Sequence, residues 1–556
     1  DAVDKLYFKS LTDSDIQLSK DELGIMVAFD KDARTVTVSD SGIGMDKDDL
    51  DRNLGTIAHS DSMAFKEENA EQQGEDVDII GQFGVGFYSA FMVAKKVRVV
   101  SKAYGSDQAW AWESDGVEGY TIEEAEREGH GTDVILTLKD NTDEEDYDAY
   151  LSEYGLKDLI KRYSNYVRYP IKMEVSKSRQ KPKPEDAGDD YTPEYEDYTE
   201  IDTINSMIPI WQRSKKEASD ADCIAFYKEK FKDTEDPVSV IRVNAEGTVS
   251  YRAMLFVPAK APYDYYTRDY VPGLRLYSNG VMIMEKCPDL LPECFRFVRG
   301  IVDSPDLSLN ISREMLQHDR QLKIIASRLE KKIKSELLSM LENDREKYET
   351  FFKNFGLQLK YGVYNEFGRN KDVLKDLLLF YSSTEKKPVT FAEYVSRMKE
   401  GQTCIYYACG QSVEKIEKLP QTELVRDKGY EILYLTEDVD EFALKVLHDL
   451  DGKEFKSVSA GDLDLDTPEE KEEEQKQQEE NKDLFAFMTE ALDGKVQTVR
   501  LSRRLKTHPV CLASAGELSL EMEKVLNAMP TDNKVKAERV LEVNESHPIF
   551  ATLTAL

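Results

Sequence analysis

The chain has 556 residues, of which 40% are hydrophobic and 33% charged, and its formal net charge at neutral pH is −34. One hydrophobic core does not organise so long a chain, and about three to five domains are expected. The acidity disfavours a nucleic-acid partner, because phosphate backbones require clustered Lys and Arg. No apolar run reaches the roughly 18 residues that span a bilayer, and no secretory leader opens the sequence. A cytoplasmic protein with no membrane partner is predicted.

Both ends of the sequence predict a segment of a longer protein. Apolar residues recur at helical spacing from the start, at Val3, Leu6, Tyr7 and Leu11. We therefore expect the sequence to begin inside an amphipathic helix, although Asp1 is also a suitable N-cap. The final residues, HPIFATLTAL, show neither a polar tail nor a helix end.

Residues 1–175 mix strand and helix patterns in the way typical of an α/β sandwich. Alternating apolar residues predict strands over 35–40, 96–102 and 132–140. Residues 176–200 then carry proline and many charges. Because this composition cannot bury a core, we interpret it as a mobile linker.

Residues 201–466 are expected to form a second α/β unit. The predicted strands lie near 238–244, 250–258 and 273–284, and the predicted long helices lie over 319–352 and 371–381. The unit closes with a strand and helix pair that repeats, in which TCIYYACG and YEILYLT are the strands. This alternation predicts a small parallel lobe.

Residues 467–556 are expected to form a third unit that mixes helices and strands. The acidic stretch over 466–492 carries an apolar face, made of Leu484, Phe485, Met488 and Leu492. A solvated helix is therefore favoured over a disordered acidic tail. A later helix bears an apolar stripe, made of Leu518, Met522, Val525, Leu526 and Met529. Core packing and a methionine-rich binding surface both fit this stripe.

The six cysteines and six histidines predict neither a disulfide framework nor a metal centre. The cysteines form no CxxC pair, and the histidines are scattered along the chain. Reduced and mostly buried thiols are the simplest interpretation.

Two glycine-rich stretches of the first unit carry the chemical signal. In TVTVSDSGIGM, an alternating strand runs into Asp40 and then into Gly42 and Gly44. A carboxylate fixed at a strand end can accept the amino group of adenine, and glycines let a flat ring approach the backbone. Taken alone, however, the stretch is a simple Asp-Ser-Gly turn.

In the second stretch, GQFGVGFYSAF, three glycines precede an apolar helix, at positions 81, 84 and 86. Backbone N–H groups at a helix start bind anions, so this stretch can hold a triphosphate. Its spacing matches neither the P-loop nor the Rossmann fingerprint. The polar insert between the two stretches could fold over a nucleotide as a lid.

An ordered series of motifs continues along the chain. It comprises SGIGM after Asp40, NLGTIA at 53–58, GQFGVGFYS at 81–89, GHGT at 129–132, IPIW at 208–211, FVPAKAPYD at 256–264, RLYSNGVMI at 275–283 and LNISREMLQ at 309–317. This series resembles the heat-shock protein 90 chaperone family in its bacterial form. The resemblance implies an α/β sandwich ATPase domain of the GHKL (Bergerat) type over 1–175 and a charged linker over 176–200. It also implies an α/β middle domain with a helical bundle over 201–466 and an α+β C-terminal dimerisation domain over 467–556.

The resemblance implies a role for each residue that matches a family motif. Asp40 would bind the adenine amino group directly, and Thr132 would assist through water. The other nucleotide contacts would come from Gly44, Asn53, His59, Gly81, Gly84, Val85, Gly86 and Phe87. Arg313 would reach the γ-phosphate from the middle domain, with Asn310 and Gln317 ordering its loop. Without the family, Arg313 is an ordinary arginine at a helix start. ATP or ADP with Mg²⁺ is the implied cofactor set.

The sequence departs from the family pattern at three places. The general-base Glu and the Mg²⁺-holding Asn would precede Asp1, so this chain as written is expected to bind nucleotide poorly and to hydrolyse it hardly at all. His59 and Asp61 stand where the family usually has Lys and Gly in a lid hinge. The terminal helices that pair two protomers would follow residue 556.

The function implied is that of an ATP-driven, stress-response chaperone whose homodimer closes as a clamp on partly folded client proteins. Clients would meet the 518–529 stripe and the region of Trp211. The alternative is another GHKL-type ATPase, either a sensor kinase or a DNA topoisomerase or mismatch-repair type. Dispersed histidines disfavour the kinase, and the acidity disfavours DNA handling. A non-catalytic scaffold is a third possibility for this chain.

Overall fold

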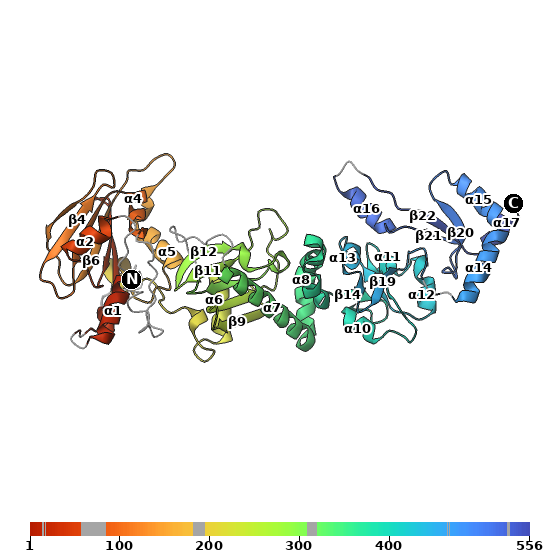
Figure 1. Ribbon diagram of the computed structural model, residues 1–556, viewed down its shortest axis with the longest axis horizontal. Coiled ribbons are helices and arrows are strands. Elements are labelled where there is room, and N and C mark those ends of the chain that lie inside the picture. Colours follow the sequence, from red (N-terminus) through yellow and green to blue (C-terminus); the bar gives the residue numbers. More distant parts are fainter. Residues whose placement is uncertain are drawn as a thin grey trace, which may run out of the picture.

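The computed structural model describes residues 1–13, 16, 18–56, 85–181, 195–307, 320–463, 465, 467–530 and 534–555. Within these residues, four β-sheets follow one another along the length of the molecule, each with its own helices (Figure 1). None of the helices described is long and apolar enough to cross a membrane. The combination of sheets and helices confirms the α/β class predicted from the sequence.

The first sheet has the strand order β5-β4-β3-β6-β2-β1-β7-β8. Its strands are β1 (Ile25–Asp30), β2 (Thr35–Asp40), β3 (Ala94–Lys102), β4 (Ala109–Ser114), β5 (Thr121–Ala125), β6 (Gly131–Leu138), β7 (Ile171–Gln180) and β8 (Tyr195–Thr203). Its helices and 3-10 turns are α1 (Ala2–Thr12), η1 (Lys20–Glu22), α2 (Lys47–Leu54), η2 (Gly86–Ser89), α4 (Ala90–Val93), η3 (Tyr147–Leu151) and α5 (Glu153–Tyr163). Leu156 and Ile160 pack α5 onto the sheet in one cluster, and Leu50 and Leu54 pack α2 onto it in another.

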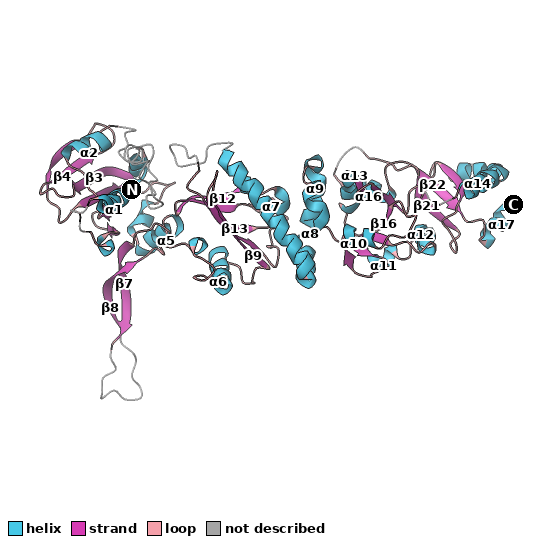
Figure 2. Ribbon diagram, turned by 60° about the horizontal axis from the view of Figure 1, so that its bottom comes forward, coloured by secondary structure: helices cyan, strands magenta, loops and turns pink. Residues whose placement is uncertain are grey.

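Strands β7 and β8 run antiparallel and extend beyond the sheet as a two-stranded arm (Figure 2). The expected absence of regular structure over residues 176–200 does not hold at either end, because both strands run into that range; residues 182–194 lie outside the described part. Opposite charges face each other across the arm, and Lys177 Nζ lies 2.8 Å from a carboxylate oxygen of Asp202. Such cross-strand pairs stabilise a strand pair whose composition is mostly polar.

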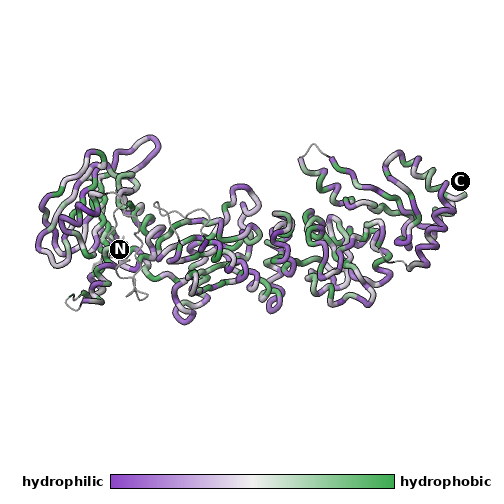
Figure 3. Tube along the Cα trace, in the orientation of Figure 1, coloured by the Kyte–Doolittle hydropathy of each residue, from purple (hydrophilic) through white to green (hydrophobic). Residues whose placement is uncertain are grey.

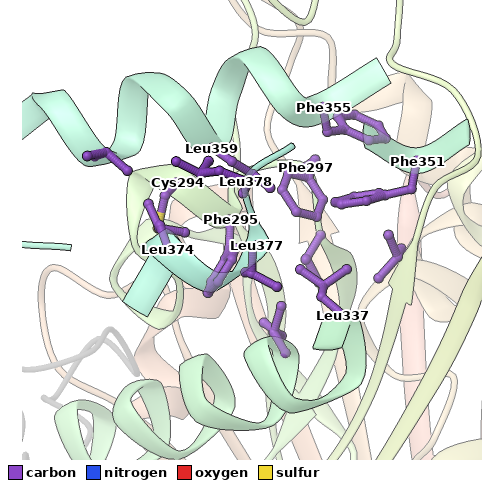
Figure 4. Packing of buried hydrophobic residues seen from close by; sticks show 14 of the residues in the cluster. Cys294, Phe295, Phe297, Leu337, Phe351, Phe355, Leu359, Leu374, Leu377 and Leu378 are labelled. Carbon is purple, nitrogen blue, oxygen red and sulfur yellow. The ribbon is translucent and has the colours of Figure 1, made fainter. Parts of the chain in front are cut away.

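The second sheet has the order β12-β11-β13-β10-β9. Its strands are β9 (Ser239–Ala245), β10 (Tyr251–Val257), β11 (Leu274–Ser278), β12 (Val281–Cys287) and β13 (Arg299–Asp303). The helices and 3-10 turns are η4 (Ile210–Gln212), α6 (Asp220–Phe231), η5 (Pro288–Leu290), η6 (Glu293–Phe295), α7 (Arg320–Asn343), α8 (Arg345–Tyr364), η7 (Asn365–Gly368), α9 (Lys371–Leu374) and η8 (Lys375–Leu377). Figure 4 shows the largest core, in which Phe297 stacks on Phe355 of α8, with Leu337 of α7 nearby.

Two helix predictions in this region differ from the structure. The helix expected over 319–352 is two helices, because the Asp344 carboxylate accepts the N–H of Lys347 at 3.2 Å and so caps a new helix. The helix expected over 371–381 does not hold in its second half, where Phe380–Ser382 forms strand β14. A short buried apolar run fits a strand as well as a helix, and sheet pairing decides between them.

The third sheet has the order β15-β14-β17-β16-β19-β18. Its strands are β14 (Phe380–Ser382), β15 (Pro388–Val389), β16 (Ile405–Cys409), β17 (Ile432–Leu435), β18 (Asp449–Leu450) and β19 (Lys453–Ser457). Its helices and 3-10 turn are α10 (Phe391–Ser396), α11 (Val413–Ile416), η9 (Pro420–Thr422), α12 (Glu423–Asp427) and α13 (Asp440–Leu447). Strand β16 pairs parallel with both β17 and β19, which confirms the predicted parallel lobe.

The fourth sheet has the order β20-β22-β21. Its strands are β20 (Thr498–Leu501), β21 (Val510–Ser514) and β22 (Arg539–Val543), and its helices are α14 (Pro468–Glu480), α15 (Lys482–Ala491), α16 (Leu520–Ala528) and α17 (Pro548–Thr554). The acidic stretch is helical as predicted: α14 is hydrophilic along its length (Figure 3), and α15 buries Phe485. Helix α16 buries none of its residues, so the core interpretation of the 518–529 stripe does not hold.

Trp211 joins the first two sheets from a buried position. Its ring is 6% exposed and packs edge-on against Tyr166, with the ring centroids 4.5 Å apart. Its indole N–H donates to Asp303 at 3.0 Å, while Arg162 forms an ion pair with Glu285 at 2.6 Å across the same junction. The Trp211 ring is therefore not accessible to a client, and the expectation that clients meet the region around it stays a prediction.

The buried ion pair between α8 and α13 provides a test of how the second and third sheets hold together. Lys360 Nζ lies 2.7 Å from Asp440 Oδ1, and the two side chains are 8% and 1% exposed. We expect Lys360→Ala to lower the free energy of unfolding by about 3–5 kcal/mol, because it leaves a carboxylate buried without its cation. Thermal melting monitored by fluorescence measures the loss.

Lys260→Ala is the matched control, since its pair with Glu235 is 68% and 48% exposed. Exposed pairs contribute little, so this variant should melt with the wild type. Equal melting temperatures for the two variants would show that the buried pair does not stabilise the junction.

Candidate functional site

Asp40 is the last residue of strand β2, which lies inside the first sheet between β6 and β1. Its Cα lies opposite that of Thr132 in the antiparallel pairing of β2 with β6. Its Oδ1 accepts the N–H of Gly42 at 2.8 Å, which fixes the side chain in a tight turn. Burial raises the pKa of the Asp40 carboxyl above its ordinary value, against the lowering effects of the Gly42 N–H and the Arg127 guanidinium. The strand end therefore presents an acceptor whose orientation is set before any ligand arrives.

Thr132 belongs to a buried hydroxyl network. Its Oγ1 lies 2.8 Å from Oγ of Ser101, which occupies the neighbouring strand β3 directly opposite it. The Ser101 hydroxyl also accepts the N–H of Met45 at 2.9 Å and donates to the carbonyl of Gly131 at 3.2 Å. Ser101 thereby ties Thr132 to the turn that follows Asp40. Sequence reasoning missed this residue, although a serine within the apolar strand KVRVVSK was a usable signal.

The glycines near Asp40 are required by close packing of the chain on itself. Gly44 has a φ of +66°, and a Cβ there would lie 1.9 Å from the carbonyl oxygen of Lys102. Gly131 has a φ of +111°, and its Cβ would lie 2.0 Å from the carbonyl oxygen of Asp40. Larger residues would force β2, β3 and β6 apart. The glycines thus set the position of Asp40 rather than simply clearing space for a ring.

Two further side chains that sequence reasoning missed surround this turn. The His130 ring Nδ1 lies 2.8 Å from the carbonyl oxygen of Gly42. The Arg127 guanidinium donates to the carbonyl of Asp40 at 3.0 Å and pairs with Asp133. His130 lies within the GHGT motif, although no role was predicted for it, and no sequence pattern pointed to Arg127.

The other half of the site is formed by α2 and the turn η2. Helix α2 starts with a capping box between Asp46 and Asp49 and carries Asn53 in its last turn. The Tyr88 hydroxyl donates to the carbonyl of Leu54 at 2.8 Å, which holds η2 beside the end of α2. Val85 and Gly86 begin this turn, which the Tyr88 hydrogen bond places beside the end of the helix that carries Asn53.

Phe87 points its ring into the core of the first sheet. The ring packs edge-on against Trp112, with the centroids 5.5 Å apart. Only its main chain is thus positioned for a ligand at the turn. The helix expected after the glycines is a 3-10 turn followed by the four-residue α4.

Six of the predicted site residues lie outside the described part of the chain, namely His59, Gly81, Gly84, Asn310, Arg313 and Gln317. Among the described residues, no group of three or more His, Cys, Asp or Glu could hold a metal ion. The six cysteines are free, and all but Cys409 are buried, as predicted.

Comparison with known proteins gives two family matches that together cover most of the chain. Residues 16–132 match the family described as histidine kinase-, DNA gyrase B-, and HSP90-like ATPase, and residues 186–556 match the Hsp90 protein family. Chaperone protein HtpG of Clostridium acetobutylicum is 60% identical over 555 residues, which covers 100% of this chain and 87% of that protein. Chaperone protein HtpG of Bacillus subtilis is 58% identical over 553 residues, with the same coverage.

The sheet that carries Asp40 and Thr132 therefore belongs to the ATPase class that histidine kinases, gyrase B and Hsp90 share. The chain as a whole is a member of the Hsp90 family in its bacterial form, and it is an ATP-dependent molecular chaperone. The match over 186–556 sets aside the sensor-kinase and topoisomerase alternatives.

The raised pKa of Asp40 predicts that the ionised side chain costs stability. A carboxyl whose pKa is higher in the folded than in the unfolded protein destabilises the fold at neutral pH, and the cost disappears as pH falls through the raised value. We expect the melting temperature of Asp40→Asn, whose amide oxygen can still accept the Gly42 N–H, to equal or exceed that of the wild type at neutral pH. Any excess in the melting temperature of the variant should shrink as the buffer is acidified, in melting curves recorded at successive pH values. A lower melting temperature for Asp40→Asn at neutral pH would contradict this reasoning.

Proposed function

We propose that Asp40 and Thr132 recognise the adenine ring of ATP and ADP. The Asp40 carboxylate would accept the exocyclic amino group, and Thr132 would act through a water molecule. The support is the geometry of the described residues: an acceptor fixed at a strand end, with a buried hydroxyl on the paired strand. Buried groups held in this way discriminate strongly between ligands that satisfy them and ligands that do not.

The phosphates would lie on the opposite side of the site, toward α2 and η2. There we propose contacts from Asn53, from the main chain of residues 81–87 and from His59. Main-chain N–H groups of a glycine-rich turn suit an anion, and the apolar packing of Phe87 fixes that turn. Arg313 would approach from the middle domain, with Asn310 and Gln317 ordering its loop, and Mg²⁺ would accompany the nucleotide. A guanidinium from a second domain stabilises phosphate charge only when the domains have docked.

The chaperone cycle would couple this site to the rest of the chain. We propose an N-terminal ATP-binding domain over 1–175, a charged segment over 176–200, a middle domain over 201–466 and a C-terminal dimerisation domain over 467–556. Nucleotide would favour the closed state of a homodimeric clamp by binding it more tightly than the open state. Partly folded clients would contact α16, whose apolar stripe is not buried. A cytoplasmic location completes the proposal.

The adenine assignment predicts a large loss of binding in Asp40→Asn. In the full-length protein we expect its Kd for ATP and for ADP to rise by about 100-fold or more, because the amide presents a donor where a charged acceptor is needed. ATP-dependent refolding of a heat-denatured client should be lost with it. Isothermal titration calorimetry and a refolding assay provide the two measurements.

Asp115→Asn is the control, since Asp115 lies in an exposed turn and accepts only local N–H groups. It should bind nucleotide like the wild type. An unchanged affinity in Asp40→Asn would refute the adenine role.

Hydrolysis provides a separate test. We further propose that the family's general-base Glu and Mg²⁺-holding Asn are not among residues 1–556, so we expect these residues alone to turn over ATP about 100-fold or more slowly than a chain that carries both. A steady-state phosphate-release assay on the two proteins measures the ratio, with Asp40→Asn of the longer chain as background. Equal rates would assign the general base to a residue within 1–556.

A further inference from the structure

Arg127 sits at the centre of the turn that joins β5 to β6. Its side chain is 11% exposed and forms a two-pronged ion pair with Asp133, with Nη2–Oδ1 at 3.0 Å and Nε–Oδ2 at 3.1 Å. The same guanidinium donates to the main-chain carbonyls of Gly129, at 3.0 Å, and of His130. One planar group therefore holds both the turn and the first residues of β6.

The guanidinium also reaches the strand that carries the adenine-binding carboxylate. Arg127 Nη2 donates to the carbonyl oxygen of Asp40 at 3.0 Å. In the pairing of β2 with β6, Asp40 lies opposite Thr132 and Ser39 lies opposite Asp133. Arg127 thus contacts the main chain of Asp40 on one strand and the neighbour of Thr132 on the other.

The residues around Arg127 leave little room for the ends of β2 and β6 to move relative to each other. Because Gly131 packs its Cα against the carbonyl of Asp40, any shift of the turn moves the end of β2 with it. His130, next along the turn, lies 2.8 Å from the carbonyl of Gly42, the residue whose N–H holds the Asp40 carboxylate. Loss of the guanidinium would release both strand ends at the point where their side chains must face one ligand.

We propose that Arg127 is a positioning residue for base recognition, which locks Asp40 and Thr132 into the geometry that selects a purine with an exocyclic amino group at C6. This inference rests on the proposed adenine site and adds a residue and a specificity to it. Arginine is needed because its planar guanidinium group donates several hydrogen bonds in fixed directions at once, whereas the ammonium group of lysine is a single compact charge. The cation also opposes the effect of burial, which raises the pKa of the Asp40 carboxyl.

Comparison of ADP with inosine diphosphate in the full-length protein tests the proposal, because inosine carries a carbonyl in place of the amino group. We expect the wild type to prefer ADP, and Arg127→Gln to raise the Kd for ADP about tenfold while leaving that for inosine diphosphate nearly unchanged. Arg127→Lys should lose the preference as well. Calorimetric titration of both nucleotides gives the ratio of affinities for each variant.

Arg98→Gln is the matched control on the same sheet. Arg98 forms ion pairs with Glu113 and Glu123, and within the described residues no hydrogen bond or ion pair joins it to the proposed site, so its variant should keep the wild-type ratio. If Arg127→Gln does not fold, Asp133→Asn replaces it, since it removes the ion pair and leaves the carbonyl contacts. We then expect Asp133→Asn to lower the preference for ADP over inosine diphosphate, but by less than Arg127→Gln would.

Three results would overturn the proposal. They are an unchanged ratio in Arg127→Gln, or in Asp133→Asn where that variant replaces it; an equal loss of affinity for both nucleotides; and full rescue by Arg127→Lys. An equal loss would mark Arg127 as a purely structural residue, and rescue by lysine would reduce its role to charge alone. Titration of Asp40→Asn tests the proposed adenine site independently of Arg127. If Asp40→Asn loses ADP binding, the adenine assignment stands whatever the Arg127 variants show; if it retains ADP binding, the adenine assignment is refuted as well.

Discussion

The approach of Gly131 to the carbonyl of Asp40 is the packing constraint on which the candidate site depends. It brings the ends of β2 and β6 so close that no side chain fits between them. Asp40 and Thr132 then face the same space, and Ser101 and Arg127 can each contact both segments. Precise recognition of a small ligand requires such rigid support. A loosely held carboxylate would lose conformational entropy when the ligand binds, and this loss would weaken the affinity.

Charge is used in two ways in this acidic protein. Where it is exposed, as along the β7–β8 arm, opposite charges alternate across strands and keep a mostly polar segment regular. Where it is buried, as at Glu542, ion pairs fix one chain segment to another. Glu542 receives both Arg500 and Arg504, and Arg504 also donates to the carbonyls of Val458 and Ala460. The fourth sheet is thereby attached to the third by directed bonds as well as by apolar contact.

Local patterns predicted most of the elements. The alternation in TVTVSD and the repeated strand and helix pairs near residues 404–447 are short-range features, and the structure follows them. The differences arise where a pattern has two solutions. The apolar run before Ser382 fits a helix or a strand, and pairing of β14 with β17 selects the strand. The charges of residues 176–200 suggested a mobile linker, whereas residues 176–180 and 195–200 pair as strands, because the sequence does not show which charges face each other across two strands.

The sequence by itself determined the family and the ATPase class, and it predicted Asp40 and Thr132 as nucleotide contacts, because these rest on motifs whose residues are contiguous. Only the tertiary structure decided how that carboxylate is held. Ser101, Arg127 and Asp133 reach the candidate site through strand register and side-chain hydrogen bonds, which join residues as far apart in the sequence as Ser39 and Asp133. The incomplete burial of α16 was decided in the same way, since whether an apolar stripe is covered depends on what packs against it and not on its spacing.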